Sequence, residues 1–446
     1  MNDFTTGKIA KPLIAFAAPM MIGNLLQQTY NIVDAMIVGR FVGGDALAAV
    51  GVSSNVALFL ISALIGLTTG SGIVIAQFFG AKQLDRLKSA VSVSIIFHFA
   101  LSVVLMILGV LLAPALLRLL NTGDEIFDDA LIYMRILLGG MLFPVFMNMY
   151  TAYLRALGDS RRPLYFLILS VICNAIVTPI FVIVLDWGVA GAAIATVFTQ
   201  FLAALTCFLY AHLKVPLLHV DKLTFDFGLF RLILKYGIPA ALQMSFVSLA
   251  HLFIVRLINS FGPAAMAGIT TVSRIDSLAT MPVYSMALAL STFVAQNMGA
   301  GLEDRAKKGF KTATLYMVAF SVIISVILMV FAPQLILLFL DQGDVNASEI
   351  VSTGQTYMHI MVMFYFLFAI FSSINGFFRG VGDAVIAMAF PIISLACRTG
   401  SAYALIGLAG MGPEALAWSI PIGWGVCCIG CWIYYKKRLW AGKVVV

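Results

Sequence analysis

Long apolar stretches, separated by short polar segments, follow one another along this chain of 446 residues. A helix needs about 20 mainly apolar residues to cross the hydrocarbon core of a bilayer. Twelve stretches reach that length, so the pattern predicts an all-α membrane protein with twelve transmembrane helices. They lie at residues 13–38, 50–78, 90–117, 131–153, 163–185, 188–211, 229–260, 268–296, 310–339, 354–377, 383–408 and 414–435.

Composition agrees with this pattern, since 62% of the residues are hydrophobic, 11% are charged and the mean hydropathy is +1.03. The first stretch contains several polar residues and has no small-residue cleavage site, so we expect it to remain in the mature protein. The six cysteines lie in apolar stretches, and no zinc, Walker A, HExxH or GxSxG motif occurs. We therefore expect a transporter without a cofactor that uses an ion gradient, and no enzyme.

Basic residues mark one side of the membrane. They cluster before the first stretch and after every second one, whereas Arg40 and Arg118 fall on the other side. Cytoplasmic loops carry the excess of Lys and Arg, so we expect both termini in the cytoplasm, in the plasma (inner) membrane of a bacterium. The net charge of +7 then reflects topology, and we expect no nucleic-acid partner.

An internal repeat predicts the architecture. Residues 76–88, AQFFGAKQLDRLK, align with 295–307, AQNMGAGLEDRAK, at an offset of 219, and RALGD at 155–159 aligns with RGVGD at 379–383 at an offset of 224. Each half thus holds six helices, and two such halves are related by a pseudo-two-fold axis along the membrane normal. We predict an N-lobe at 1–212, a cytoplasmic linker at 213–228 and a C-lobe at 229–446, with a substrate cavity between the lobes.

Both repeated motifs fall in short loops on the predicted cytoplasmic side. Gly permits tight turns there, and Arg or Lys complements the C-terminal end of a helix. We expect structural or gating roles for these motifs, because transporter substrate sites lie near the bilayer midplane.

The first stretch carries a polar face. Asn24, Gln27, Asn31 and Asp34 recur at helical spacing, and a carboxylate at bilayer depth costs at least ~2.5 kcal/mol, so Asp34 is a candidate to bind or carry a cation. Pro19 removes a backbone hydrogen bond and allows the helix to bend. A bend controlled by the charge of Asp34 would act as a switch.

The order of these features resembles the multidrug and toxic compound extrusion family, MATE. The resemblance rests on Pro19, on Val33 and Asp34 followed by Gly39, on the two RxxGD loops and on the repeat. The segment SRIDSLATMP at 273–282 is most similar to the bacterial branch related to the DNA-damage-inducible F type. The resemblance implies cation-coupled export of amphipathic, often cationic, drugs through two six-helix lobes.

The same resemblance implies a cation site in the N-lobe. Asp34 matches the family's carboxylate, Asn174 an asparagine of the fifth helix and Thr196 a threonine of the sixth. Many relatives have a second aspartate directly before a proline, where this chain has Thr178 before Pro179. A hydroxyl cannot carry the second charge, so H+ or Na+ coupling stays open, with a lean towards protons.

The C-lobe also places charged groups inside apolar stretches. They form either a self-neutralising structural group or a second site sensitive to ions or substrate. The spacing of Arg274 and Asp276 opposes a simple pair on one helical face. The complete set is His251, Arg256, Arg274, Asp276 and Arg398.

Substrate contacts are predicted from flexible thioethers and aromatic rings on helices that flank the cavity. A lipid-linked oligosaccharide flippase of the same superfamily is the alternative function, and an intramembrane enzyme is a third class without a matching cluster. We expect a monomer whose partners are a small drug-like molecule and the lipid bilayer. The predicted cavity residues are Met20, Met21, Tyr30, Met147, Tyr150, Met244, Met281 and Tyr284.

Overall fold

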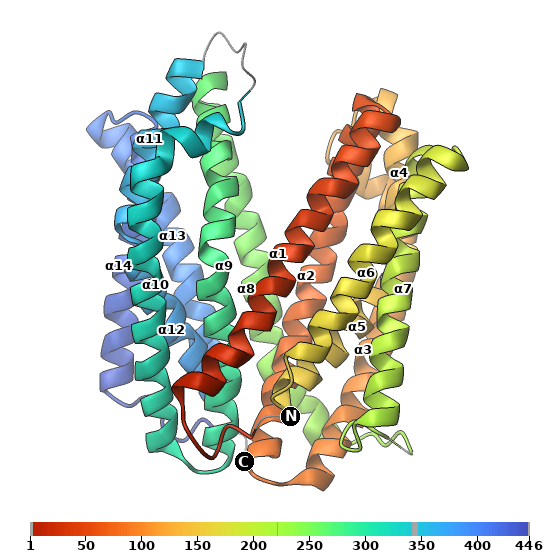
Figure 1. Ribbon diagram of the computed structural model, residues 1–446, viewed down its shortest axis with the longest axis vertical. Coiled ribbons are helices and arrows are strands. Elements are labelled where there is room, and N and C mark those ends of the chain that lie inside the picture. The colour runs from red at the N-terminus through yellow and green to blue at the C-terminus, as the bar shows by residue number, and fades with distance from the viewer. Residues whose placement is uncertain (1–2, 221, 341–346, 445–446) are drawn as a thin grey trace. The chain divides into compact units, whose positions relative to one another are not determined.

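Every regular element of the structure described below is a helix. The computed structural model describes residues 3–220, 222–340 and 347–444, and only the backbone of 31 and 248–252. Within these ranges the chain divides into two compact units, shown as ribbons in Figure 1. Apart from the extreme termini, unit 1 comprises Pro19–Ala241, and unit 2 comprises Phe4–Ala18 together with Leu242–Val444. These limits lie inside helices, whereas the predicted lobes meet at the 213–228 linker.

The helices coincide with the twelve predicted stretches. In chain order they are α1 (Ala10–Phe41), α2 (Gly44–Gly80), α3 (Leu84–Leu119), α4 (Asp124–Gly139), α5 (Leu142–Ala156), α6 (Arg161–Pro179), the π-helical turn η1 (Ile180–Val184), α7 (Gly188–Lys214), α8 (Phe227–Asn259), α9 (Pro263–Gly299), α10 (Glu303–Leu337), α11 (Ala347–Met363), α12 (Tyr365–Val381), α13 (Ala384–Ala409) and α14 (Glu414–Lys436).

Two predicted stretches are bent helix pairs. α4 and α5 meet at 44°, and α11 and α12 meet at 50°. Gly139 and Gly140 mark the first break, where weak helix propensity favours a bend. Met363 and Phe364 stand at the second, at the same offset of 224. Searched over the described residues, eight helices are long and apolar enough to cross a membrane, and the bent pairs bring that number to ten. α1 and α8 lie at the other two predicted positions.

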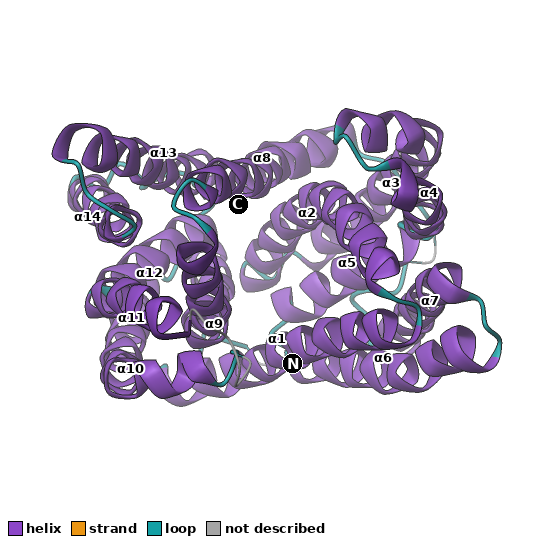
Figure 2. Cartoon of the chain, turned by 90° about the horizontal axis from the view of Figure 1, so that it is seen from above, coloured by secondary structure: helices purple, strands orange, loops and turns teal. Residues whose placement is uncertain are grey.

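Unit 1 packs around α2 and α7. Figure 2 shows its helices from above: α2 packs against α3, α4 and α5, and α7 packs against α4, α5 and α6. A Cβ atom placed on Gly66 or Gly70 of α2 would collide with the backbone of α8 at Ala241 or Gly237. Small residues of this kind let membrane helices approach closely, and here they hold the first half of α8 in unit 1.

Unit 2 holds the N-terminal segment with the second copy of the repeated motif. The Arg305 guanidinium donates hydrogen bonds to the backbone oxygens of Phe4, Thr6 and Gly7 at 2.7–2.9 Å. Asn297 donates to the Phe4 carbonyl as well, at 3.2 Å. This copy of the motif therefore has a structural role, since it anchors the chain just before α1.

Candidate functional site

A chain of polar side chains joins α1, α6 and α7 inside unit 1. Thr178 of α6 donates to Asp34 of α1 at 3.4 Å, Asn174 donates to the Tyr30 hydroxyl at 3.5 Å, and Tyr30 donates to Thr196 of α7 at 3.4 Å. The structure thus brings together all four residues of the predicted cation site and adds Tyr30, which was predicted to contact substrate. The distances lie at the long end of the hydrogen-bond range.

The local sequence explains how α6 presents these groups. Asn174 and Thr178 are four residues apart, so both side chains lie on one face of the helix, and both are buried. Pro179 follows and cannot donate a backbone hydrogen bond. The helix widens there into the π-turn η1, and single π-turns occur frequently at functional sites.

Asp34 is a buried carboxylate without a basic partner in its surroundings. Its exposed fraction is 9%, and it makes no ion pair with a Lys or Arg in the part of the chain that the structure describes. Tyr133 of α4 lies within electrostatic reach and adds no positive charge. A carboxylate in this position is stable only when it is protonated or holds a cation.

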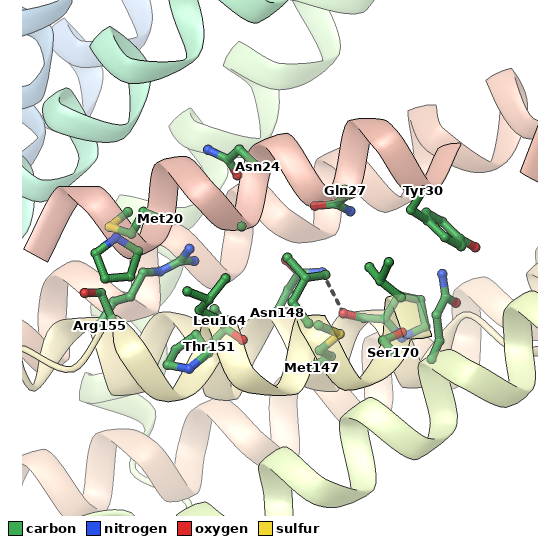
Figure 3. A pocket seen from close by; sticks show the side chains of 18 residues that line it. Met20, Asn24, Gln27, Tyr30, Met147, Asn148, Thr151, Arg155, Leu164 and Ser170 are labelled. Carbon is green, nitrogen blue, oxygen red and sulfur yellow. Dashed lines mark hydrogen bonds between the residues drawn. The ribbon is translucent and has the colours of Figure 1, made fainter. Parts of the chain in front are cut away.

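The rest of the predicted polar face borders a cavity of about 180 Å³ between α1, α5, α6 and α7 (Figure 3). Asn24, Gln27 and Tyr30 line it from α1, and Pro19 and Met20 lie towards the start of that helix. α1 runs through Pro19 without interruption, so the bend remains a prediction. The side chain of Asn31 is outside the described residues.

The predicted substrate residues divide between the two units. Met20, Tyr30 and Met147 line the cavity of unit 1, whereas Tyr150 is buried against Tyr153 and Phe208. Met21 is half-buried and is not among the residues that line this cavity. Three others belong to unit 2 and therefore lie outside this cavity, namely Met244, Met281 and Tyr284.

The charged group of unit 2 is arranged around Asp276. Tyr365 of α12 donates to its carboxylate at 2.6 Å, and Arg398 of α13 lies within electrostatic reach. Arg274 and Arg256 are exposed instead. His251 lies outside the described side chains. Asp276 therefore has a hydroxyl donor and a nearby guanidinium, both supplied by the protein.

Comparison with known proteins identifies the family. The sequence model of the MatE family matches residues 19–180 and 239–404. The chain belongs to the MatE family. Its relatives include YpnP, a probable multidrug resistance protein of Bacillus subtilis, which is 30% identical over 98% of this chain and 97% of its own length. An FAD transporter of Shewanella oneidensis is 26% identical over 76% of each chain.

Solved structures support the same family assignment. An outward-facing multidrug resistance MATE family transporter of the MOP superfamily has a TM-score of 0.91 and 25% identity, and the match covers 98% of this chain and 97% of that one. The predicted family, the all-helical fold and the assignment as a membrane transporter rather than an enzyme are confirmed. The more specific bacterial branch stays a prediction.

One residue of this MatE protein was missed in the sequence. Arg155 belongs to the repeated RxxGD motif, for which we expected a structural or gating role, yet its side chain lines the cavity of unit 1. Its neighbour in the motif, Asp159, is structural as expected: it accepts hydrogen bonds from the backbone N–H groups of Arg161 and Arg162 at the start of α6. The signal in the sequence was spacing, since Met147, Thr151 and Arg155 follow one face of α5.

Proposed function

We propose that this protein exports amphipathic, drug-like molecules in exchange for H+ or Na+, with Asp34 as the coupling residue. Relatives described as multidrug resistance proteins support the export of drugs. The single observation that supports the coupling is the buried carboxylate of Asp34, which has no basic partner among the described residues.

The chemistry of the site fits a small monovalent cation. The Thr178 hydroxyl contacts the Asp34 carboxylate, and the hydroxyl and amide groups of Tyr30, Thr196 and Asn174 are hydrogen-bonded to one another on the same three helices. Oxygen ligands of these kinds suit hard cations. No group of three or more His, Cys, Asp or Glu occurs among the described residues, so their arrangement does not resemble a transition-metal site. Uptake of a proton or Na+ removes the negative charge, and α1 then tolerates a less polar environment.

Transport in proteoliposomes tests this function. Wild-type protein is given a pH gradient or a Na+ gradient separately, and the movement of rhodamine 6G, a lipophilic cation, is followed by fluorescence. We expect one gradient to drive transport and Asp34→Asn to reduce the rate at least ~10-fold, because removal of an essential charged group costs more than 1.4 kcal/mol.

The matched control is Asp186→Asn. Asp186 is exposed in the loop before α7 and has a positive φ of 52°, a conformation that Asn tolerates as well as Asp. The control removes the same charge from the same unit and leaves transport unchanged. Equal rates for wild type and Asp34→Asn under both gradients would exclude Asp34 as the coupling residue.

A further inference from the structure

The cavity of unit 1 has an unexpected charge for a drug exporter. Among the described residues that line it, Arg155 is charged and none is Asp or Glu. We propose that this cavity binds amphipathic organic anions and that Arg155 recognises their carboxylate or phosphate group. The proposal rests on the export function above and adds anionic molecules, which this cavity binds, to the cationic dye used to test export.

The first argument is that Arg155 has no anionic partner. Its guanidinium makes no hydrogen bond or ion pair with any residue that the structure describes, and its side chain is half-buried at the end of α5. In Figure 3 it extends from α5 towards α1, beside Met20. A half-buried cation without a counter-charge attracts an anion from outside, and the planar guanidinium matches carboxylate and phosphate geometry.

Neighbouring and repeated positions show arginines of this fold that have a side-chain partner, either a carboxylate or a neutral amide. Arg162 forms an ion pair with Asp159 at 2.9 Å. Arg379, at the repeat position equivalent to Arg155, donates to Asn375 one turn earlier at 3.2 Å. The residue one turn before Arg155 is Thr151, which lines the same cavity. The protein therefore gives two of these arginines a partner and leaves Arg155 directed into a cavity.

The remaining lining fits the uncharged part of such a molecule. Met20, Leu164 and Met147 offer apolar and polarisable surface, and Gln27 and Gln200 offer amide groups that hydrogen-bond without adding charge. A ligand with one anionic end and an apolar or aromatic body satisfies both kinds of surface. A purely cationic ligand meets the guanidinium without a compensating carboxylate in this cavity.

A structural role for Arg155 is the alternative explanation. Basic residues in the last turn of a helix interact favourably with its dipole, and Arg155 lies in the last turn of α5. That role requires a positive charge at this position, and it does not require a cavity beside the side chain. It therefore predicts no dependence of anion binding on Arg155, which an experiment can measure.

Binding of two related dyes to the purified protein tests the proposal. Fluorescein is an anionic xanthene and rhodamine 6G a cationic one, and fluorescence anisotropy reports the affinity for each. We expect wild type to bind fluorescein and Arg155→Gln to bind it about 10- to 100-fold more weakly, as expected for loss of a hydrogen-bonded charge pair. Arg155→Lys should retain part of the affinity, and Arg135→Gln, which removes an exposed cation outside the cavity, should retain all of it.

A second variant, Thr151→Asp, tests whether weaker fluorescein binding arises merely from loss of folding. It keeps Arg155 and places a carboxylate one turn earlier on α5, where acid and base at this spacing stabilise a helix. We expect a folded protein, monitored by its melting temperature, that has lost fluorescein binding. Unchanged fluorescein affinity in Arg155→Gln and Thr151→Asp would overturn the proposal.

Two further comparisons separate the possible sources of the anion and the possible failures. Nanodiscs of phosphatidylcholine with added phosphatidylglycerol should displace fluorescein if the site takes a lipid headgroup, and leave it bound if it takes a soluble anion. Wild type that transports rhodamine 6G and binds no fluorescein would overturn the anion site and leave the export function standing. Wild type that binds fluorescein through Arg155 and transports neither dye would overturn the export function and leave the anion site standing.

Discussion

Asp34 in unit 1 and Asp276 in unit 2 are both carboxylates within long membrane helices, yet their surroundings differ. Thr178 reaches Asp34 at 3.4 Å, and no described Lys or Arg pairs with it. Asp276 accepts a bond of 2.6 Å from Tyr365 and has Arg398 nearby. A charge that the protein compensates needs no ion from outside. On this difference rests our proposal that the coupling ion binds in unit 1.

The arginines of the repeated RxxGD motif differ in the same way. Arg379 has Asn375 as its hydrogen-bond partner, whereas Arg155 lines a cavity and has no such partner among the described residues. Both halves have an arginine at this position, and the residue one turn earlier differs: Thr151 in unit 1 and Asn375 in unit 2. The carboxylate without a basic residue paired to it and the guanidinium without a hydrogen-bond partner, among the described residues, are both in unit 1.

The largest expected effect separates the two aspartates. Asp34→Asn should reduce transport at least ~10-fold, whereas Asp276→Asn should keep the rate within about 2-fold, because only an uncompensated carboxylate needs the ion. Asp276→Asn should instead lower the melting temperature, since Arg398 loses a nearby negative charge. Rhodamine 6G transport and thermal unfolding measure the two quantities. An equal loss of transport in both variants would place coupling in both units.

A second prediction concerns the close packing of α2 in unit 1. Gly70→Ala should destabilise the protein by about 1–3 kcal/mol, a usual range for overpacking, because the added Cβ meets the backbone at Gly237. At the repeat position equivalent to Gly70, unit 2 has Ala289, which is fully buried. Gly51→Ala, in the same helix α2, is the control, since nothing lies within 4 Å of its added Cβ. Equal melting temperatures for the two variants would contradict this account.

A third, smaller effect compares Arg305 with Arg86, its counterpart at the offset of 219. Arg305→Gln removes hydrogen bonds to three backbone oxygens, so hydrogen exchange at residues 4–18 should accelerate at least ~5-fold, given about 1 kcal/mol per bond. Arg86 packs over the ring of Phe78, and Arg86→Gln should leave that exchange unchanged. Acceleration in both variants would indicate general destabilisation.

The smallest expected effect is at Thr178. Thr178→Val keeps the shape of the side chain and removes the hydroxyl that reaches Asp34. Because that contact is long, we expect the ion concentration for half-maximal transport to change by about 3-fold, close to the free energy of one weak hydrogen bond. Thr178→Ser retains a hydroxyl and should behave as wild type. A 3-fold change in the serine variant too would assign the effect to packing.

The bent helices show which structural features the local sequence predicts and which it does not. Gly139 and Gly140 suggest the break between α4 and α5, but nothing in Met363 and Phe364 suggests the corresponding break between α11 and α12. The bend recurs at the same place in the repeat although the local residues differ, so we infer that packing within each unit imposes it. Similarly, spacing predicted that Arg274 would not simply pair with Asp276, and it could not predict Tyr365, which is 89 residues away.

By itself the sequence determined the helices, the repeat, the family and the presence of a carboxylate at Asp34. These follow from the length and periodicity of apolar stretches, since a bilayer admits little else than satisfied helices. Only the tertiary structure decided which polar groups are compensated. It connected Thr178, Asn174 and Thr196 with Asp34 and Tyr30 of α1, where no described Lys or Arg forms an ion pair with Asp34. It also showed that Arg155, expected to be a loop residue, lines a cavity. Charge compensation depends on distances between helices that are remote in sequence, and no local pattern encodes those distances.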